Sequence, residues 1–282
     1  MKSGMGWLYG VVIAQLLFVY PVYLNFSEKS DNPLRALKGK LNNVYCKKIL
    51  VFIIPITITL FLQWGQNSSY RIIIGDKYSV EILASIAVGF SVSGAIFNAV
   101  SSLAVQYFNP IYLRKITNST KKCRVQAWNE LADVMLPIYM CLMIFVICLS
   151  PYLLDILVAE KFKHVYLFVA LGAVIEYFRV SSNVVYMVSQ SEVRTTSTIL
   201  PYMVGFIASI LPLYFTDLTG NLWLIGVVLS FSYSLIFTLL YLNMKKILPV
   251  RINVNPTFKS LLLSTPFILI PLMRLPASWF IS

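Results

Sequence analysis

Glu176, Arg179, Asn183 and Met187 recur at three- and four-residue spacing within the apolar stretch 164–188. This spacing predicts that their side chains share one face of a helix. A carboxylate and a cation inside an apolar helix are costly unless they face other protein or a water-filled cavity. Two interpretations stay open. Arg179 binds an anionic group of a substrate while Glu176 neutralises or gates it, or the two residues form a structural ion pair that joins helices.

A second polar group lies in and around the stretch FLQWGQNSSYRIIIG, which begins at residue 61. Thr59, Gln63 and Asn67 recur at four-residue intervals, which predicts a polar stripe on a helix. The next apolar segment carries a similar stripe of Ser91, Gly94, Asn98 and Ser101 or Ser102. Stripes of this kind line a hydrated cavity, or they let helices approach closely and form hydrogen bonds. Arg71 is also typical of an interfacial arginine whose head group reaches the membrane surface.

The sequence offers little that suits catalysis or metal binding. It has one histidine, His164, and four cysteines without a CxxC pair. It also lacks clustered acidic residues, a GxSxG motif and a glycine-rich phosphate loop. We therefore expect no catalytic residue, no metal and no cofactor, and we predict that the chain is not an enzyme.

The composition places these residues in a membrane. Of the 282 residues, 58% are hydrophobic and 12% are charged, and the mean hydropathy is +0.76. A helix that crosses a bilayer needs about 20 mostly apolar residues. We predict an all-α, polytopic membrane helix bundle with about eight transmembrane helices, at about 5–25, 48–66, 80–105, 131–154, 164–188, 197–216, 221–244 and 258–281. The connectors are predicted to be short except for 26–47 and 106–130.

The basic residues predict how the bundle is oriented. Sixteen of the 23 lysines and arginines lie in the connectors that face one side, which the positive-inside rule assigns to the cytoplasm. The net charge of +12 is thus a topology signal, and we expect no binding of nucleic acid. Both termini then face outward. An outward amino terminus is more natural for an internal helix, so we expect the chain to be a fragment of a longer protein.

Residues 49–115 carry a resemblance to a known family. The features are an apolar segment with a proline, the motif N-S-S-x-R-x-I-I-G, an amphipathic span, and N-P-x-Y-x-[KR], here "NPIYLR". In this order they resemble the start of the second half of bacterial oligosaccharide-lipid flippases. These form the O-antigen and capsule family within the multidrug/oligosaccharidyl-lipid/polysaccharide exporter superfamily. Tyr70 stands where this family usually has an acidic residue.

The resemblance implies one six-helix lobe of a two-lobe transporter. Residues 1–47 would be a single transmembrane helix and basic cytoplasmic loop at the end of a preceding lobe. Residues 48–244 would form the six-helix lobe, and 245–282 a cytoplasmic linker with a trailing transmembrane helix. Arg71 would cap the outer end of the second span, and Arg179 would face the cavity.

The resemblance also implies a function. The chain would flip a polyprenyl-diphosphate-linked oligosaccharide across the bacterial cytoplasmic (inner) membrane during biosynthesis of surface polysaccharide such as O-antigen or capsule. Its partners would be this lipid-linked oligosaccharide, membrane lipids and other polysaccharide-assembly membrane proteins. The alternatives are a small-molecule cation antiporter of the same superfamily and a non-catalytic membrane assembly component. The candidate substrate-binding residues are Arg179, Glu176, Asn183, Arg71, Asn67 and Gln63.

Overall fold

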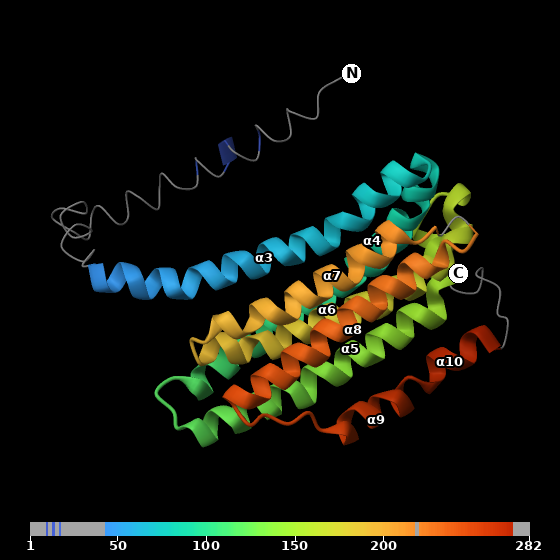
Figure 1. Ribbon diagram of the computed structural model, residues 1–282. Helices are drawn as coiled ribbons and strands as arrows, with labels where there is room; N and C mark the ends of the chain where they lie inside the picture. The colour runs from blue at the N-terminus through green and yellow to red at the C-terminus, as the bar shows by residue number, and fades with distance from the viewer. Residues whose placement is uncertain (1–9, 11–12, 15–16, 18–42, 218–219, 273–282) are drawn as a thin grey trace. The chain divides into compact units, whose positions relative to one another are not determined.

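The computed structural model describes residues 43–217 and 220–272, with four isolated positions nearer the amino end (Figure 1). Every regular element in this part of the chain is helical. The α-helices are α3 (Asn43–Lys77), α4 (Val80–Ile116), α5 (Lys121–Leu157), α6 (Tyr166–Ser191), α7 (Ile199–Phe215), α8 (Trp223–Ile247), α9 (Val254–Leu263) and α10 (Thr265–Leu272). Two short 3-10 helices, η1 (Glu160–Val165) and η2 (Thr195–Thr198), precede α6 and α7. The all-α prediction is confirmed for the described residues.

Six helical segments of the described part are long and apolar enough to cross a membrane. They are Leu50–Lys77, Val80–Ile116, Lys121–Leu157, Glu160–Ser191, Thr195–Phe215 and Trp223–Ile247. The chain is therefore a helical membrane protein, and these segments coincide with six of the eight predicted spans. The first predicted span, 5–25, lies almost wholly outside the described residues. The last predicted span, 258–281, begins within α9 and continues through α10, and Ser264 lies between these two helices. The end of this span lies outside the described residues.

The prediction of a long connector at 106–130 is wrong, because most of these residues are helical. Helix α4 continues to Ile116, and α5 begins at Lys121 after Thr120, whose hydroxyl accepts a hydrogen bond from the Cys123 amide. The connector is thus only four residues long. Polar and basic residues keep helical backbone hydrogen bonds readily in water, so a helix does not end where its apolar run ends. For the same reason α3 continues to Lys77, beyond the predicted end of its span.

Consecutive helices from α4 to α9 run in opposite directions (Figure 1), so the connectors 117–120, 192–198 and 248–253 lie at one end of the bundle. Basic residues gather around them, in the last turn of α4, the first turn of α5 and the last turn of α8. We call this the basic end. The prediction that it faces the cytoplasm rests on the positive-inside rule.

The chain divides into two units, Met1–Ile53 and Ile54–Ser282, and all contacts described below lie within the second. Its central helix is α6, which packs against α4, α5 and α8. Glycines let the helices approach closely. A Cβ on Gly172 would lie 2.2 Å from Ser93 Oγ, and a Cβ on Gly226 would lie 2.6 Å from Leu171 Cδ1. Helix α7 packs on α8, and helices α9 and α10 pack along α5 (Figure 1).

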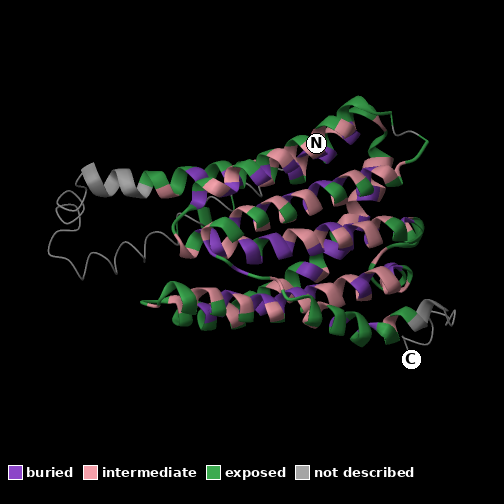
Figure 2. Cartoon of the chain, turned by 60° about the horizontal axis from the view of Figure 1, so that its bottom comes forward, coloured by how far each residue is buried: buried purple, intermediate pink, exposed green. Residues whose placement is uncertain are grey.

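Burial differs strongly among the helices. Buried residues lie on the faces by which the helices meet, and exposed residues on the outer faces (Figure 2). In the most apolar part of the span that contains α6, half of the residues are buried, whereas the corresponding figure for α3 is 17%. Helix α3 is held instead by separate side-chain contacts. The hydroxyls of Thr59 and Thr198 lie 3.0 Å apart, and Gly65 faces the ring of Phe206. This loose attachment leaves space beside α6.

Candidate functional site

A cavity of about 520 Å³, which we call cavity 1, lies among α3, α4, α6 and α8. Its wall contains both charged and uncharged polar side chains. These include Asn67, Arg71, Ser91, Asn98, Glu176 and Arg179. A polar cavity among helices that cross a membrane is a candidate path or binding site, because such side chains are costly in contact with lipid.

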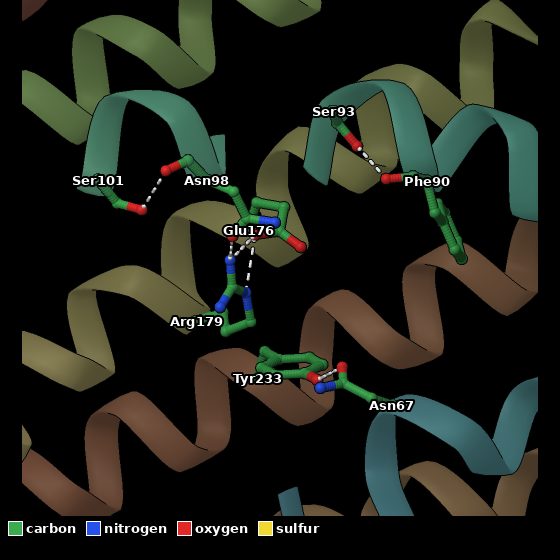
Figure 3. Close-up of polar contacts among 8 residues, drawn as sticks. All are labelled: Asn67, Phe90, Ser93, Asn98, Ser101, Glu176, Arg179 and Tyr233. Atoms are coloured by element: carbon green, nitrogen blue, oxygen red, sulfur yellow. Dashed lines mark hydrogen bonds and ion pairs between the residues drawn. The ribbon is translucent and has the colours of Figure 1, made fainter. Parts of the chain in front are cut away.

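Arg179 and Glu176 form an ion pair on the wall of cavity 1 (Figure 3). The Nη2 and Nε atoms of Arg179 lie 2.5 and 2.7 Å from the same carboxylate oxygen, Oε2 of Glu176. Nη2 also donates a hydrogen bond of 2.7 Å to Oδ1 of Asn98 on α4. The Arg179 side chain stays 27% exposed. Its guanidinium is therefore positioned by two partners and still borders open space.

The opposite wall joins α3 to α8. The hydroxyl of Tyr233 donates a hydrogen bond to Oδ1 of Asn67 (Figure 3). At the neighbouring positions, Nε2 of Gln66 donates to the Ser232 hydroxyl at 2.7 Å, and this hydroxyl donates at 2.7 Å to the carbonyl of Gly205 on α7. Oε1 of Gln66 is buried and has no hydrogen-bond partner within the described chain. These bonds orient the polar face of α3 toward α8 and cavity 1.

Arg71 is on the wall of cavity 1 as well. Its Nε donates a hydrogen bond of 3.0 Å to the Tyr70 hydroxyl, and its guanidinium carbon lies 5.6 Å from the centre of the Tyr70 ring. No ion pair involves Arg71 in the described part of the chain. Helix α3 continues for six more residues to Lys77, so Arg71 is not its last residue, and the expectation that Arg71 caps the outer end of the second span stays a prediction.

A smaller cavity of about 50 Å³, cavity 2, adjoins cavity 1 and shares Asn67, Arg179 and Tyr233 with it. Gln63 and Asn183 line cavity 2. The structure therefore places all six candidate residues around two adjoining cavities. Arg179, Glu176, Arg71 and Asn67 line the larger one. That these residues bind a substrate stays a prediction.

Sequence reasoning did not select three polar residues of this site. Tyr233 and Ser232 lie in α8, whose apolar sequence has no polar periodicity that would have singled them out. Gln66 is next to the selected Asn67 but one position off the four-residue stripe. Asn98 belongs to a stripe that the sequence did reveal, although its bond to Arg179 depends on the packing of α4 against α6.

Within the described residues, no group of three His, Cys, Asp or Glu side chains is arranged to hold a metal ion. Comparison of the chain with protein-family models, with curated proteins and with solved structures finds no match. The functional argument therefore depends on the residues of this chain.

Proposed function

We propose that this chain is part of a transporter that flips a polyprenyl-diphosphate-linked oligosaccharide across the cytoplasmic membrane of a bacterium. In this proposal residues 48–244 form one six-helix lobe of a two-lobe protein with about eight transmembrane helices in this chain. Residues 1–47 and 245–282 contribute the flanking helices. The chain moves its ligand without chemical change and is not an enzyme.

The observation that carries this proposal is the arrangement of Arg179. Its guanidinium borders a cavity of about 520 Å³ between membrane-spanning helices, and Arg71 lines the same cavity without an ion-pair partner among the described residues. A guanidinium is well suited to phosphate oxygens, because its donors form a planar fork. Arg179 on α6 and Arg71 on α3 thus bring two cations to one cavity, where a diphosphate could contact both. The outer faces of the helices carry exposed apolar side chains, and the lipid tail of the ligand would remain beside them in the bilayer.

The neutral polar residues of the wall suit the same ligand. Asn67, Asn98 and Ser91 offer hydrogen bonds to phosphate or sugar oxygens. Glu176 reduces the local positive charge, which would allow the ligand to leave as well as to bind, since a transported ligand must not bind too tightly.

A binding experiment tests this function. The purified chain in lipid nanodiscs should bind polyprenyl diphosphate, and Arg179→Ala should lower the affinity by about tenfold or more, since a hydrogen bond to a charged group contributes about 1.5–3 kcal/mol. Arg179→Lys should retain part of the affinity, because an ammonium group meets phosphate without paired donors. Lys115→Ala is the matched control, because Lys115 does not line cavity 1 or cavity 2.

Equal affinity in the Arg179→Ala protein and the unchanged chain would contradict the proposed role of this arginine. Transport of a small organic cation by reconstituted protein, without any binding of polyprenyl diphosphate, would support the antiporter alternative. Absence of both activities in a stably folded chain would support an assembly component.

A further inference from the structure

A third cavity, cavity 3, has a volume of about 290 Å³ and lies among α4, α5 and α6, nearer the basic end than cavity 1. Its lining is half polar, and none of the lining residues carries a charge. The polar members are Ser101, Asn109, Tyr139, Asn183, Tyr186 and Gln190. Asn183 also lines cavity 2, so cavities 1, 2 and 3 follow one another along α6.

The amide side chains of cavity 3 are open to partners from outside the described chain. Asn183 and Gln190 are exposed although they lie on a helix that is long and apolar enough to cross a membrane. Oδ1 of Asn109 is buried and has no hydrogen-bond partner in the described part of the protein. An amide that faces hydrocarbon without a partner costs several kcal/mol, roughly 4–8 on transfer from water to cyclohexane. Cavity 3 is therefore unsuited to contact with lipid tails.

We propose that cavity 3 is a second binding site, and that it takes an uncharged, hydroxyl-rich group, the carbohydrate part of the transported ligand. Three amides line it, and each amide offers both donors and an acceptor, as sugar hydroxyl groups do. Val105, Val180 and Met187 supply apolar surface for the C–H faces of a sugar ring. A phosphate finds no cation here, and a metal ion finds no carboxylate.

The position of cavity 3 relative to Arg179 fits one elongated ligand. Asn183 lies one helical turn after Arg179, and Gln190 lies three turns after Arg179. The three residues are therefore on the same side of α6. At 1.5 Å per residue, the distance along the axis from Arg179 to Gln190 is about 16 Å. A ligand whose diphosphate lies at Arg179 would thus extend its sugars toward the basic end. This inference rests on the proposed function and assigns a separate place to the carbohydrate.

The first test compares two probes in nanodiscs: polyprenyl diphosphate alone, and the same lipid carrying a short neutral oligosaccharide. Gln190→Leu removes an amide that lines cavity 3 but not cavities 1 and 2. It should lower the affinity for the glycosylated probe by about two- to tenfold, as expected for one neutral hydrogen bond, and leave the affinity for the plain diphosphate unchanged. Leu103→Ala serves as the control, because Leu103 is 68% exposed and lines none of the three cavities.

The outcomes separate the two proposals. Equal affinities of the Gln190→Leu and unchanged chains for the glycosylated probe would overturn the carbohydrate site and leave the proposed function intact. Failure of the unchanged chain to bind either probe would overturn the proposed function itself. A matching loss of affinity for both probes in the Gln190→Leu protein would mean that cavity 3 does not distinguish the sugar, which also overturns the inference.

A second test does not depend on a polar-to-apolar change. The four cysteines, Cys46, Cys123, Cys141 and Cys148, are replaced by serine, and one cysteine is introduced by Ser101→Cys or, as the control, Leu103→Cys. A charged, membrane-impermeant thiol reagent reacts with thiolate in water. The cysteine at position 101 should react and the one at position 103 should not, and the glycosylated probe should slow the reaction severalfold more than the plain diphosphate. An unreactive Ser101→Cys protein would mean that cavity 3 is closed to aqueous ligands, and the proposal would then be wrong.

Discussion

Two ion pairs involve α6 or the residue that follows it, and they have almost the same exposure. The pair Arg179–Glu176 lies at cavity 1, with side chains 27% and 16% exposed. The pair Arg124–Glu192 lies at the basic end, with side chains 28% and 14% exposed. Exposure alone therefore does not tell a structural ion pair from a candidate binding pair.

The geometry of the two pairs does differ. Arg124 meets both oxygens of Glu192, with Nε 2.8 Å from Oε1 and Nη2 3.3 Å from Oε2. Only the contact of Nη2 with Oε2 has hydrogen-bond geometry, and the pair links α5 to the residue after α6. In the other pair, Nε and Nη2 of Arg179 both contact a single oxygen of Glu176, which lies in the same helix. Nη2 also donates to Asn98. We infer that Arg124–Glu192 holds the fold together, whereas Arg179 keeps donors for a ligand.

The largest expected effect on stability is that of Arg124→Ala. It leaves the Glu192 carboxylate mostly buried without its cation and removes a link between two helices. We expect a loss of about 2–3 kcal/mol in the free energy of unfolding, somewhat below the cost for a fully buried pair because both side chains retain some contact with water. Titration of the purified protein with a denaturing detergent measures this loss.

Arg179→Ala is the matched comparison in the same titration. Its partner Glu176 borders cavity 1 and can be hydrated there, so we expect a loss below about 1 kcal/mol. If Arg179→Ala destabilises the protein as much as Arg124→Ala does, the pair at cavity 1 is structural and the comparison fails.

Double-mutant cycles compare the two ion pairs through their coupling energies, which we expect to be smaller than the loss caused by Arg124→Ala. The coupling energy between Arg124 and Glu192 should be about 1–2 kcal/mol, because the two residues join separate elements and their side chains are mostly buried. The coupling between Glu176 and Arg179 should be about 0.3–0.5 kcal/mol, as is usual for pairs three residues apart on one helix. Alanine single and double variants of each pair provide both cycles. A reversed order of the two coupling energies would refute the assignment.

Asn98→Ala tests the second partner of Arg179. This change removes the hydrogen bond between α4 and α6 at cavity 1, and water in the cavity can replace it. We therefore expect a loss of only about 0.5–1 kcal/mol in stability. The same variant should lower the affinity for polyprenyl diphosphate, because the guanidinium is then held by Glu176 alone. Unchanged affinity would show that Asn98 does not position Arg179.

The smallest effect is expected for Lys115→Ala. The pair Lys115–Glu130 connects α4 to α5 at a distance of 2.5 Å, but its side chains are 50% and 46% exposed. Water screens such a pair, so its loss should change the free energy of unfolding by no more than about 0.5 kcal/mol. A larger change would mean that water does not screen the Lys115–Glu130 pair as expected.

The sequence alone determined the kind of fold. Apolar runs of about 20 residues can only become helices in a bilayer, because every backbone polar group must be bonded within its own segment. Composition and length therefore located the six long helices of the described part. The ends of these helices could not be predicted in the same way. Residues 106–130 are polar enough to look like a loop, yet most of them extend α4 and α5.

For the candidate site too, the sequence determined one part and the tertiary structure the other. The spacing of Glu176, Arg179 and Asn183 determined that they share a face of one helix, because the period of the α-helix is fixed. Only the tertiary structure decided that Arg179 meets Asn98 from α4, that Tyr233 meets Asn67, and that α3 leaves a cavity beside α6. These contacts join residues 81 and 166 positions apart, so they depend on how whole helices pack, and helix packing is set by the summed shape of many side chains that no local pattern encodes.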